Sequence, residues 1–233
     1  MAHNEALEDM HLSPAVEEIL GAGTPGAHLS VDGPSGRLQS CRGQMQVFGD
    51  ANTAMPRPMT PDAAHDLGSV TKVAATTAML MSLATAGRLT PSAPLASYLP
   101  TAPPDMRVRD LLHHRAGLWE WWPTYVSCSG PDEAIRLVTA LPLRYPPPSG
   151  RHYSDLGFMI VGRVVEEVTG LRLPDAFAEL VRTPLGLSGI RYGGSPAGTA
   201  AAASSPGDRG ERRMIETGEP YPVPVDASRF DRW

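Results

Sequence analysis

The sequence predicts an α+β protein in which helices carry most of the core and a small antiparallel sheet precedes them. Apolar residues with helical spacing recur after residue 69, and two short strand-like segments separated by a turn occur before residue 50. The chain has 233 residues, of which 42% are hydrophobic and 19% are charged. This composition is typical of a globular protein with a substantial core.

We expect one helix and one strand pair in the first part of the chain. Residues 13–20 are typical of a short helix, with Ser13 as N-cap and Pro14 at the first helical position. Residues 27–31 and 44–48 are expected strands. The turn between them lies at 32–36. The residues between this turn and the second strand are expected to extend one of the two strands, and the sequence leaves open which one. We expect residues 50–64 to form a loop.

The stretch 65–87 organises the rest of the sequence. Ser69 and Lys72 stand one helical turn apart, and the helical spacing continues through Val73, Thr77, Leu80 and Ala84 up to Gly87, a left-handed cap. A buried helix of this kind places the serine hydroxyl and the lysine amine on one face, at the positive end of the helix dipole. Burial favours a neutral, basic lysine, so the pair is typical of an activated nucleophile. The alternative is an N-cap serine beside a solvated lysine.

Further helices are expected downstream. A loop with one helical turn occupies residues 89–100. Apolar periodicity and capping residues then predict helices over 106–113 (closed by Gly117), 132–141, 154–170 and 174–181. A proline-rich loop at 145–150 leads into the third of these helices.

An aromatic segment lies between the helices. Trp119, Trp121, Trp122 and Tyr125 either line a pocket for an apolar or acyl group or form a hydrophobic plug beneath a long loop. The plug is the favoured interpretation. The three tryptophans are nevertheless kept as candidate substrate-binding residues.

Tyr153 is the second candidate for proton transfer. A tyrosine beside a lysine ammonium has a lowered pKa and is able to act as a general base. His113 and His114 diverge on a helix and make a poor metal pair, so we expect them to belong to a partly buried structural turn. His152 adjoins Tyr153 and is expected in its surroundings. The sequence contains no zinc motif and no Gly-x-Ser-x-Gly elbow.

Several motifs in a fixed order resemble one known family. They are 67–72 (Leu-Gly-Ser-Val-Thr-Lys), 87–89, 98–100, 108–118, 153–155 (Tyr-Ser-Asp), 162–170 and 184–186. The sequence resembles the serine β-lactamase and penicillin-binding-protein superfamily, and within it the class C β-lactamase-like esterases and D-alanyl peptidases. The likeness covers residues 26–189. It implies one β-lactamase-like domain over residues 1–233, with a helical subdomain, an incomplete antiparallel sheet and an irregular tail at 193–233.

The resemblance also implies roles for individual residues. Ser69 is the implied acyl-accepting nucleophile and its N–H an oxyanion donor, Lys72 orients the serine, and Tyr153 takes its proton. Asp155 stands where class C relatives usually carry Asn, beside the lysine, and such an acid keeps the lysine protonated. A rival interpretation takes residues 154–155 as the start of a class A Ser-Asp-Asn motif. Leu156 in the third position favours Tyr153 instead.

The third motif of the family, Lys-Thr-Gly or His-x-Gly on a strand, has no counterpart after Tyr153. That strand supplies a second oxyanion donor, and the loss of such a donor costs about 10²–10³ in rate. The chain is therefore expected to be either part of a longer hydrolase or a truncated product. Its end at Trp233 favours the first.

The expected function is that of a serine hydrolase acting through an acyl-enzyme, on carboxylic esters more than on amides or β-lactams. The alternative is a catalytically impaired homologue that serves as a binding module or has no activity. We expect a small-molecule substrate and no cofactor or metal, and a net charge of -5 argues against nucleic acid as a partner. No segment is long and apolar enough to span a membrane, and the first residues lack a signal-peptide core, so a cytoplasmic location is expected.

Overall fold

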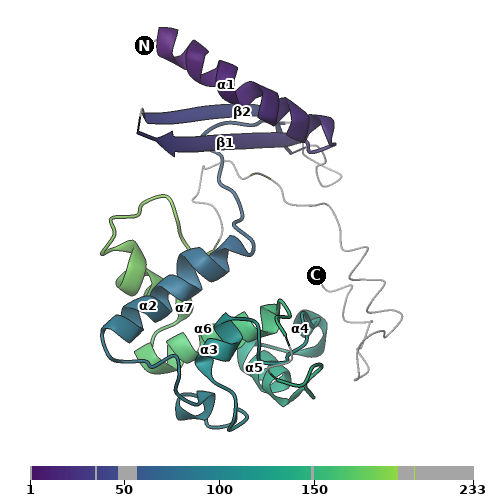
Figure 1. Cartoon of the computed structure of the whole chain (residues 1–233), viewed down its shortest axis with the longest axis vertical. Coiled ribbons are helices and arrows are strands. Elements are labelled where there is room, and N and C mark those ends of the chain that lie inside the picture. The colour runs from purple at the N-terminus through teal and green to yellow at the C-terminus, as the bar shows by residue number, and fades with distance from the viewer. Residues whose placement is uncertain (1, 35, 47–56, 148–149, 194–201, 203–233) are drawn as a thin grey trace. The chain divides into compact units, whose positions relative to one another are not determined.

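The structure is a computed structural model that describes residues 2–34, 36–46, 57–147, 150–193 and 202. The chain divides into two compact units, the first built mainly from residues 1–67 and the second mainly from residues 68–193 (Figure 1). The expected single domain over residues 1–233 stays a prediction. Apart from residues 193 and 202, the expected tail at 193–233 lies outside the described residues.

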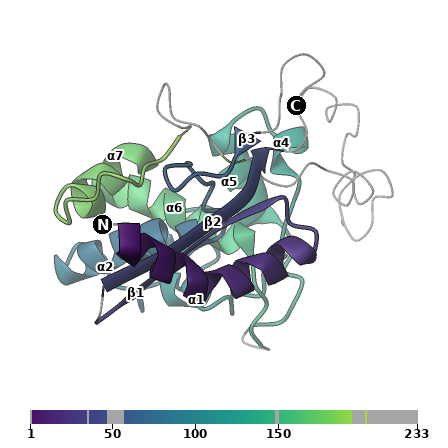
Figure 2. The same ribbon diagram turned by 90° about the horizontal axis from the view of Figure 1, so that it is seen from above.

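The first unit contains a long helix and an antiparallel sheet. Strands β1 (Gly26–Gly33), β2 (Gly36–Gln46) and β3 (Arg57–Pro58) lie in the order β1-β2-β3. The pairing of β1 with β2 runs from Gly26 opposite Gly43 to Gly33 opposite Gly36. Helix α1 (Ala2–Gly21) lies along the β1–β2 pair (Figure 2).

The strand predictions are confirmed in kind and corrected in extent. The residues that follow the turn belong to the second strand, which begins at Gly36, while residues 47–48 of the expected strand lie outside the described residues. The expected loop at 50–64 contains β3, which was not predicted. The edge of β2 explains this pairing, because the backbone groups along a strand edge need hydrogen-bond partners. Directly after β3, the Met59 N–H donates to the Gly43 carbonyl at 2.8 Å.

The prediction that Ser13 caps a helix over 13–20 is wrong. Helix α1 continues through this position and Pro14 lies inside it. The Ser13 hydroxyl instead accepts a hydrogen bond from Arg42 of β2 at 3.0 Å, and Arg42 also pairs with Glu17 at 3.5 Å. The serine side chain is therefore used to join the helix to the sheet, and it does not terminate the helix.

The second unit is built around α6 (Asp155–Thr169). Helices α3 (Val108–Leu112), α5 (Pro131–Ala140), α7 (Leu173–Phe177) and the π-helix η1 (Lys72–Thr77) contact it. Its fully buried face consists of Leu156, Ile160, Val161, Val164 and Val165. The Ser154 hydroxyl caps its N-terminus by accepting from the Gly157 N–H, and Gly170 ends it at φ 73°, as predicted.

The helix that follows Ser69 is confirmed, but of its predicted buried face only Leu80 is fully buried. Val73 is 71% exposed, and the buried positions of η1 and α2 (Ala78–Thr85) are Ala75, Thr76, Met79, Leu80 and Leu83. The first turns are a π-helix, whose wider turn shifts the phase of the side chains relative to α-helical spacing. The Thr77 hydroxyl donates to the Lys72 carbonyl at 2.7 Å in this wide turn.

The remaining expected helices are present. Helices α3, α5 and α7 lie within or close to the predicted ranges, α7 continues as the π-helix η3 (Ala178–Arg182), and η2 (Leu95–Ser97) is the expected single turn. A short helix that was not predicted, α4 (Thr124–Ser127), lies in the aromatic segment. Among the described residues, no helix combines the length and apolarity needed to cross a membrane.

Two glycines of the second unit offer a matched test of how the loop before the aromatic segment is held. Gly117 has φ 74° and Gly87 has φ 69°, but only at Gly117 does an added Cβ collide with a backbone atom, the Tyr145 carbonyl oxygen. Gly87→Ala is expected to lower the free energy of unfolding by about 1–2 kcal/mol through the left-handed conformation alone. Gly117→Ala is expected to cost about 1–3 kcal/mol more because of the collision. Urea unfolding followed by circular dichroism measures both, and equal losses in the two variants would contradict this account.

Candidate active site

Ser69 and Lys72 lie together at the start of the first helical segment of the second unit. The helical residues begin at Val70, so Ser69 occupies the N-terminal end, where backbone N–H groups lack intrahelical acceptors. The Lys72 ammonium donates a hydrogen bond to the Ser69 Oγ at 3.1 Å. The two side chains therefore share one face, as the spacing predicted.

The start of α6 brings two further polar side chains to the same lysine. Lys72 Nζ lies 2.6 Å from Asp155 Oδ1 and 4.9 Å from the centroid of the Tyr153 ring. The Lys72 side chain is 14% exposed, whereas the Asp155 side chain is 44% exposed. The structure thus places Ser69, Lys72, Tyr153 and Asp155 in one cluster, while their roles in catalysis stay predictions.

The electrostatics of the cluster favour a charged lysine. Burial lowers the pKa of Lys72, but its hydrogen bonds with Asp155 and Tyr153, together with the charges of these two groups, outweigh that effect and raise the pKa above its ordinary value. The expectation that burial makes this lysine neutral is therefore wrong. The expected effect of Asp155, which keeps the lysine protonated, agrees with the geometry.

The same contacts make the tyrosine more acidic. Hydrogen bonds with Lys72 and then with Ser69 lower the pKa of the Tyr153 phenol, and the charge of Lys72 acts in the same direction. Slight burial and the charge of Asp155 oppose this shift. A hydroxyl, an ammonium and a tyrosine of lowered pKa in mutual contact are able to activate a serine nucleophile.

The loop after α3 holds the Tyr-Ser-Asp segment in place. The Ser154 hydroxyl donates to the Trp119 carbonyl at 2.6 Å, and the Asp155 N–H donates to the Glu120 carbonyl at 2.8 Å. The Ser154 N–H donates to Nδ1 of His114 at 3.0 Å. Sequence reasoning treated His114 only as part of a structural turn. The signal for a larger role was its place in the motif 108–118, because this motif also includes part of the loop that supports the site.

Charged and aromatic groups secure this loop from the other side. The Glu120 carboxylate accepts hydrogen bonds from Arg144, at 2.5 Å, and from the Tyr145 hydroxyl. The Arg144 guanidinium lies over the Trp119 ring at 4.8 Å, and the Tyr145 ring stacks on His152. The proline-rich loop therefore braces both the aromatic segment and the residues that precede Tyr153.

The tryptophans occupy different environments. Trp122 is 2% exposed and belongs to the core. Trp119 packs edge-to-face on it at 5.9 Å and donates its indole N–H to the Pro142 carbonyl, while Trp121 lies half-buried beside Tyr125. This placement of Trp119 and Trp122 fits the packing interpretation. Contact of the three tryptophans with a substrate stays a prediction.

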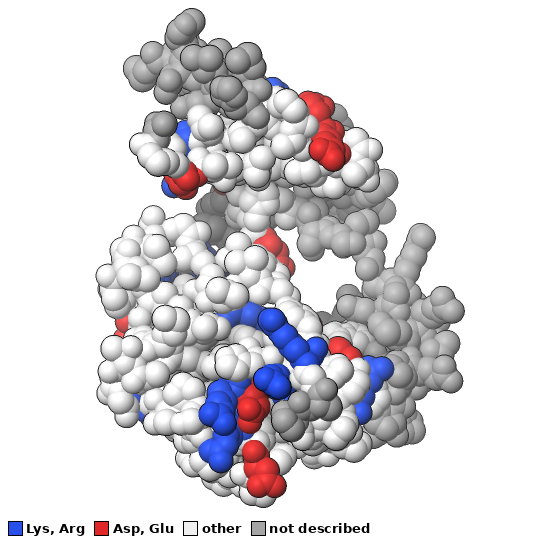
Figure 3. All heavy atoms as spheres, viewed as in Figure 1, with Lys and Arg blue, Asp and Glu red and all other residues white. Residues whose placement is uncertain are grey.

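An open pocket of about 430 Å³ lies beside the loop, lined by Leu112, His113, Arg115, Gly150 and Arg151. Figure 3 shows Lys and Arg side chains grouped near the middle of the second unit, with acidic side chains among them. No three His, Cys, Asp or Glu side chains come together to hold a metal ion within the described part of the chain. Cys41 and Cys128 are not joined to each other by a disulfide.

Comparisons with known proteins indicate the family of the chain. A family model described as Beta-lactamase matches residues 39–224. The "Putative D-alanyl-D-alanine carboxypeptidase" of Escherichia coli (strain K12) is 32% identical over 159 residues, which cover 60% of this chain and 36% of that relative.

Solved structures share the fold. SurE matches with a TM-score of 0.66 and 27% identity over 85% of this chain and 44% of that chain. A class C beta lactamase from Rhodobacter sphaeroides matches with a TM-score of 0.60 and 23% identity over 79% of this chain and 49% of that one. The present chain spans less than half the length of each of these three proteins.

The link between Lys72 and Tyr153 is testable by titration. In Lys72→Met the Tyr153 phenol loses a hydrogen bond and a neighbouring positive charge, so its pKa is expected to rise toward the ordinary tyrosine value. NMR of protein labelled at the tyrosine ζ-carbon follows this titration, with the Tyr153→Phe variant to assign the signal. The exposed Arg136→Met serves as the control and leaves the midpoint in place. An unchanged midpoint in Lys72→Met would show that the lysine does not set the acidity of the phenol.

Proposed function

We propose that this chain, which belongs to the Beta-lactamase family, is a serine hydrolase that forms an acyl-enzyme on Ser69. The observation that carries the proposal is the single cluster in which Lys72 contacts Ser69, Asp155 and Tyr153. A serine alone is a poor nucleophile and needs a base within hydrogen-bond reach. Tyr153 supplies that base, because its lowered pKa increases the share of phenolate at neutral pH.

Acylation follows from these contacts. The Tyr153 phenolate takes the proton of the Ser69 hydroxyl while Oγ attacks the substrate carbonyl carbon. The Lys72 ammonium stabilises the Ser69 Oγ and the Tyr153 phenolate oxygen. The tetrahedral intermediate then collapses, the bond to the leaving alkoxide breaks, and Tyr153 returns its proton to that oxygen. In the second half Tyr153 takes a proton from water as it attacks the acyl carbon, the bond between that carbon and Ser69 Oγ breaks, and Tyr153 returns the proton to Oγ, which releases the acid and free Ser69.

The developing oxyanion receives one donor from the described residues. The Ser69 N–H lies at the helix N-terminus, where it is available to a substrate oxygen. Removal of one donor from such a site typically costs about 10²–10³ in rate. Slow acylation is therefore expected of this chain, and covalent labelling is a more sensitive measure than turnover.

Carboxylic esters are the proposed substrates. An alkoxide leaves more readily than an amine, so an ester places the smaller demand on a site with one oxyanion donor. Amides are the second class, because the similar protein from Escherichia coli is named for a peptidase activity on D-alanyl-D-alanine. Asp155 argues for esters as well, because it stands where class C relatives usually carry Asn, and this departure argues against amide-type substrate recognition.

Covalent labelling tests the nucleophile directly. Incubation with p-nitrophenyl acetate is expected to release one equivalent of p-nitrophenol in a burst and to leave an acetyl group on Ser69, found by peptide mass spectrometry. Ser69→Ala is expected to lose both signals. Ser97→Ala, at an exposed serine of the same unit, retains them. Acetylation at another residue, or an undiminished burst in Ser69→Ala, would refute the proposal.

The pH dependence of acylation tests the proton transfer. The rate is expected to rise as Tyr153 ionises and to fall at high pH as Lys72 loses its proton. Asp155 raises the pKa of both groups, so Asp155→Asn is expected to shift both limbs of the profile to lower pH. Asp132→Asn, which alters an ion pair with Arg163, is the matched control and leaves both limbs in place. A profile of Asp155→Asn that coincides with wild type would contradict the assigned roles.

A further inference from the structure

We propose that His114 is a positioning residue for Tyr153, and that loss of its Nδ1 acceptor, by substitution with a residue that has none or by protonation, releases the tyrosine segment from the site. This inference rests on the proposed function for its effect on catalysis. The structural part, which is the attachment of the Tyr153 segment to His114, is testable without any activity.

One residue holds both peptide neighbours of Tyr153. The carbonyl oxygen of His114 accepts the N–H of His152 at 2.8 Å, and its Nδ1 accepts the N–H of Ser154 at 3.0 Å. The imidazole also contacts the Tyr153 ring, with the ring centroids 4.5 Å apart. Tyr153 itself is 49% exposed, so the surrounding core gives it little support of its own. His114 therefore contributes to the position of Tyr153 through both of its peptide neighbours and through its ring.

The backbone of His114 adopts a strained conformation. Within the described ranges it is the one non-glycine residue with positive φ, at 57°, and it is only 7% exposed. Non-glycine residues in the left-handed region cost free energy and persist where the surrounding structure holds them, often at functional sites. In this conformation the carbonyl oxygen and the Nδ1 of His114 each accept an N–H group of the segment 152–154.

The hydrogen bond to Ser154 requires one state of the ring. Nδ1 is able to accept a hydrogen bond only when it carries no hydrogen of its own, so the imidazole is neutral with its hydrogen on Nε2. In a protonated ring Nδ1 carries a hydrogen and no longer accepts from the Ser154 N–H. The hydrogen bond is then lost, and two N–H donors face each other.

The charges around the imidazole favour the neutral form near pH 7. Burial lowers the pKa of His114, and the positive charges of Arg151 and Lys72 lower it further. Asp155 acts in the opposite direction but does not reverse the shift. Tyr153 is the other titratable group in contact with the ring. Protonation, and with it release of the segment, is therefore confined to acid pH.

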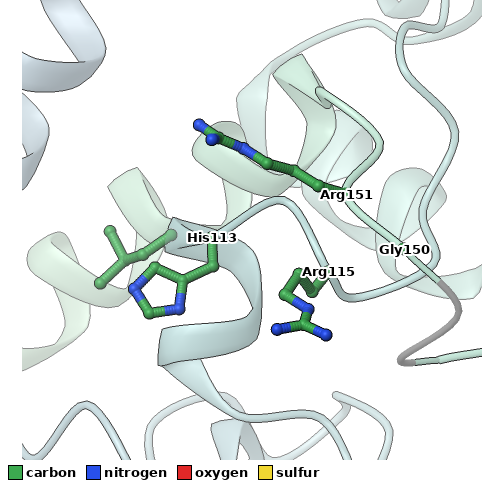
Figure 4. A pocket seen from close by; sticks show the side chains of 5 residues that line it. His113, Arg115, Gly150 and Arg151 are labelled. Carbon is green, nitrogen blue, oxygen red and sulfur yellow. The ribbon is translucent and has the colours of Figure 1, made fainter.

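The neighbours of His114 in the chain face a different environment. His113 and Arg115 are exposed and line the open pocket with Arg151, as Figure 4 shows. His113 is thus a histidine one residue away that lacks a described contact with Tyr153 or Ser154. It provides the matched control for every substitution at His114.

Three substitutions separate the contributions of His114. His114→Asn keeps an acceptor near the position of Nδ1 and tolerates positive φ, but it does not titrate. His114→Gly relieves the backbone strain and removes the acceptor, and His114→Ala removes the acceptor and keeps the strain. If the acceptor positions Tyr153, the asparagine variant retains function and both others lose it. If the residue serves only to make the turn, the glycine variant retains function as well.

The experiment combines two measurements on the full chain. Acetylation of Ser69 by p-nitrophenyl acetate is followed over a range of ester concentrations, and hydrogen exchange of the Ser154 amide is followed by NMR from pH 4 to pH 8. Relative to wild type, the limiting acylation rate is expected to fall roughly 10- to 100-fold in His114→Ala and His114→Gly, because a misplacement of about 1 Å costs about that much. The half-saturating ester concentration is expected to stay the same. His114→Asn and His113→Asn are expected to remain within a few-fold of wild type.

The amide of Ser154 reports on the attachment itself. In wild type and in His113→Asn its protection is expected to fall as His114 gains a proton in acid, whereas in His114→Asn it stays constant over that range. Equal losses of acylation in the asparagine, alanine and glycine variants would overturn the role of the acceptor. Protection of Ser154 that does not change with pH in wild type would overturn the role of protonation. Absence of any Ser69 adduct in wild type would refute the proposed hydrolase, and the exchange data would still decide the attachment.

Discussion

The ammonium of Lys72 is the point on which the candidate site depends. It lies within hydrogen-bond or ion-pair distance of Ser69 and Asp155 and contacts the ring of Tyr153, and these residues come from two helical segments far apart in the sequence. A charged amine that is largely buried needs compensation, and Asp155 provides it. With the charge fixed in this way, the amine cannot also be the base. In the proposed mechanism the proton of the serine therefore goes to another group, and Tyr153 is the group that the geometry offers.

The position of that base is determined by a loop outside the two helices. The segment from His114 to Glu120 contributes acceptors for the backbone N–H groups of 152, 154 and 155. Glu120 is in turn held by Arg144 and Tyr145, which precede the tyrosine in the chain. The motif 108–118 thus does more than end a helix, because its hydrogen bonds connect the segment of Tyr153, an exposed catalytic candidate, to the packed core.

Local patterns predicted much of the second unit, whose capping signals are strong. Ser154 and Gly170 delimit α6 as expected, and the spacing of Ser69 and Lys72 placed their side chains together. The errors arise where a contact distant in sequence decides the local structure. Arg42 engages Ser13 and the helix continues through Pro14, and the π-helical turn at Lys72 leaves Val73 exposed. The role of His114 was missed for the same reason, since nothing in adjacent residues shows that its ring meets the backbone of Ser154.

Asp155 imposes a compromise on the chemistry of this site. Its charge stabilises the Lys72 ammonium, and that ammonium lowers the pKa of Tyr153, while the same carboxylate acts directly on Tyr153 in the opposite direction. A phenol whose pKa falls less is a stronger base once ionised but is ionised less often at neutral pH, and catalysis by a general base depends on the product of these two quantities. An amide in place of the carboxylate removes the second effect and leaves the lysine free to share its proton. In the proposed mechanism, therefore, tyrosine moves the proton and lysine supplies a fixed positive charge.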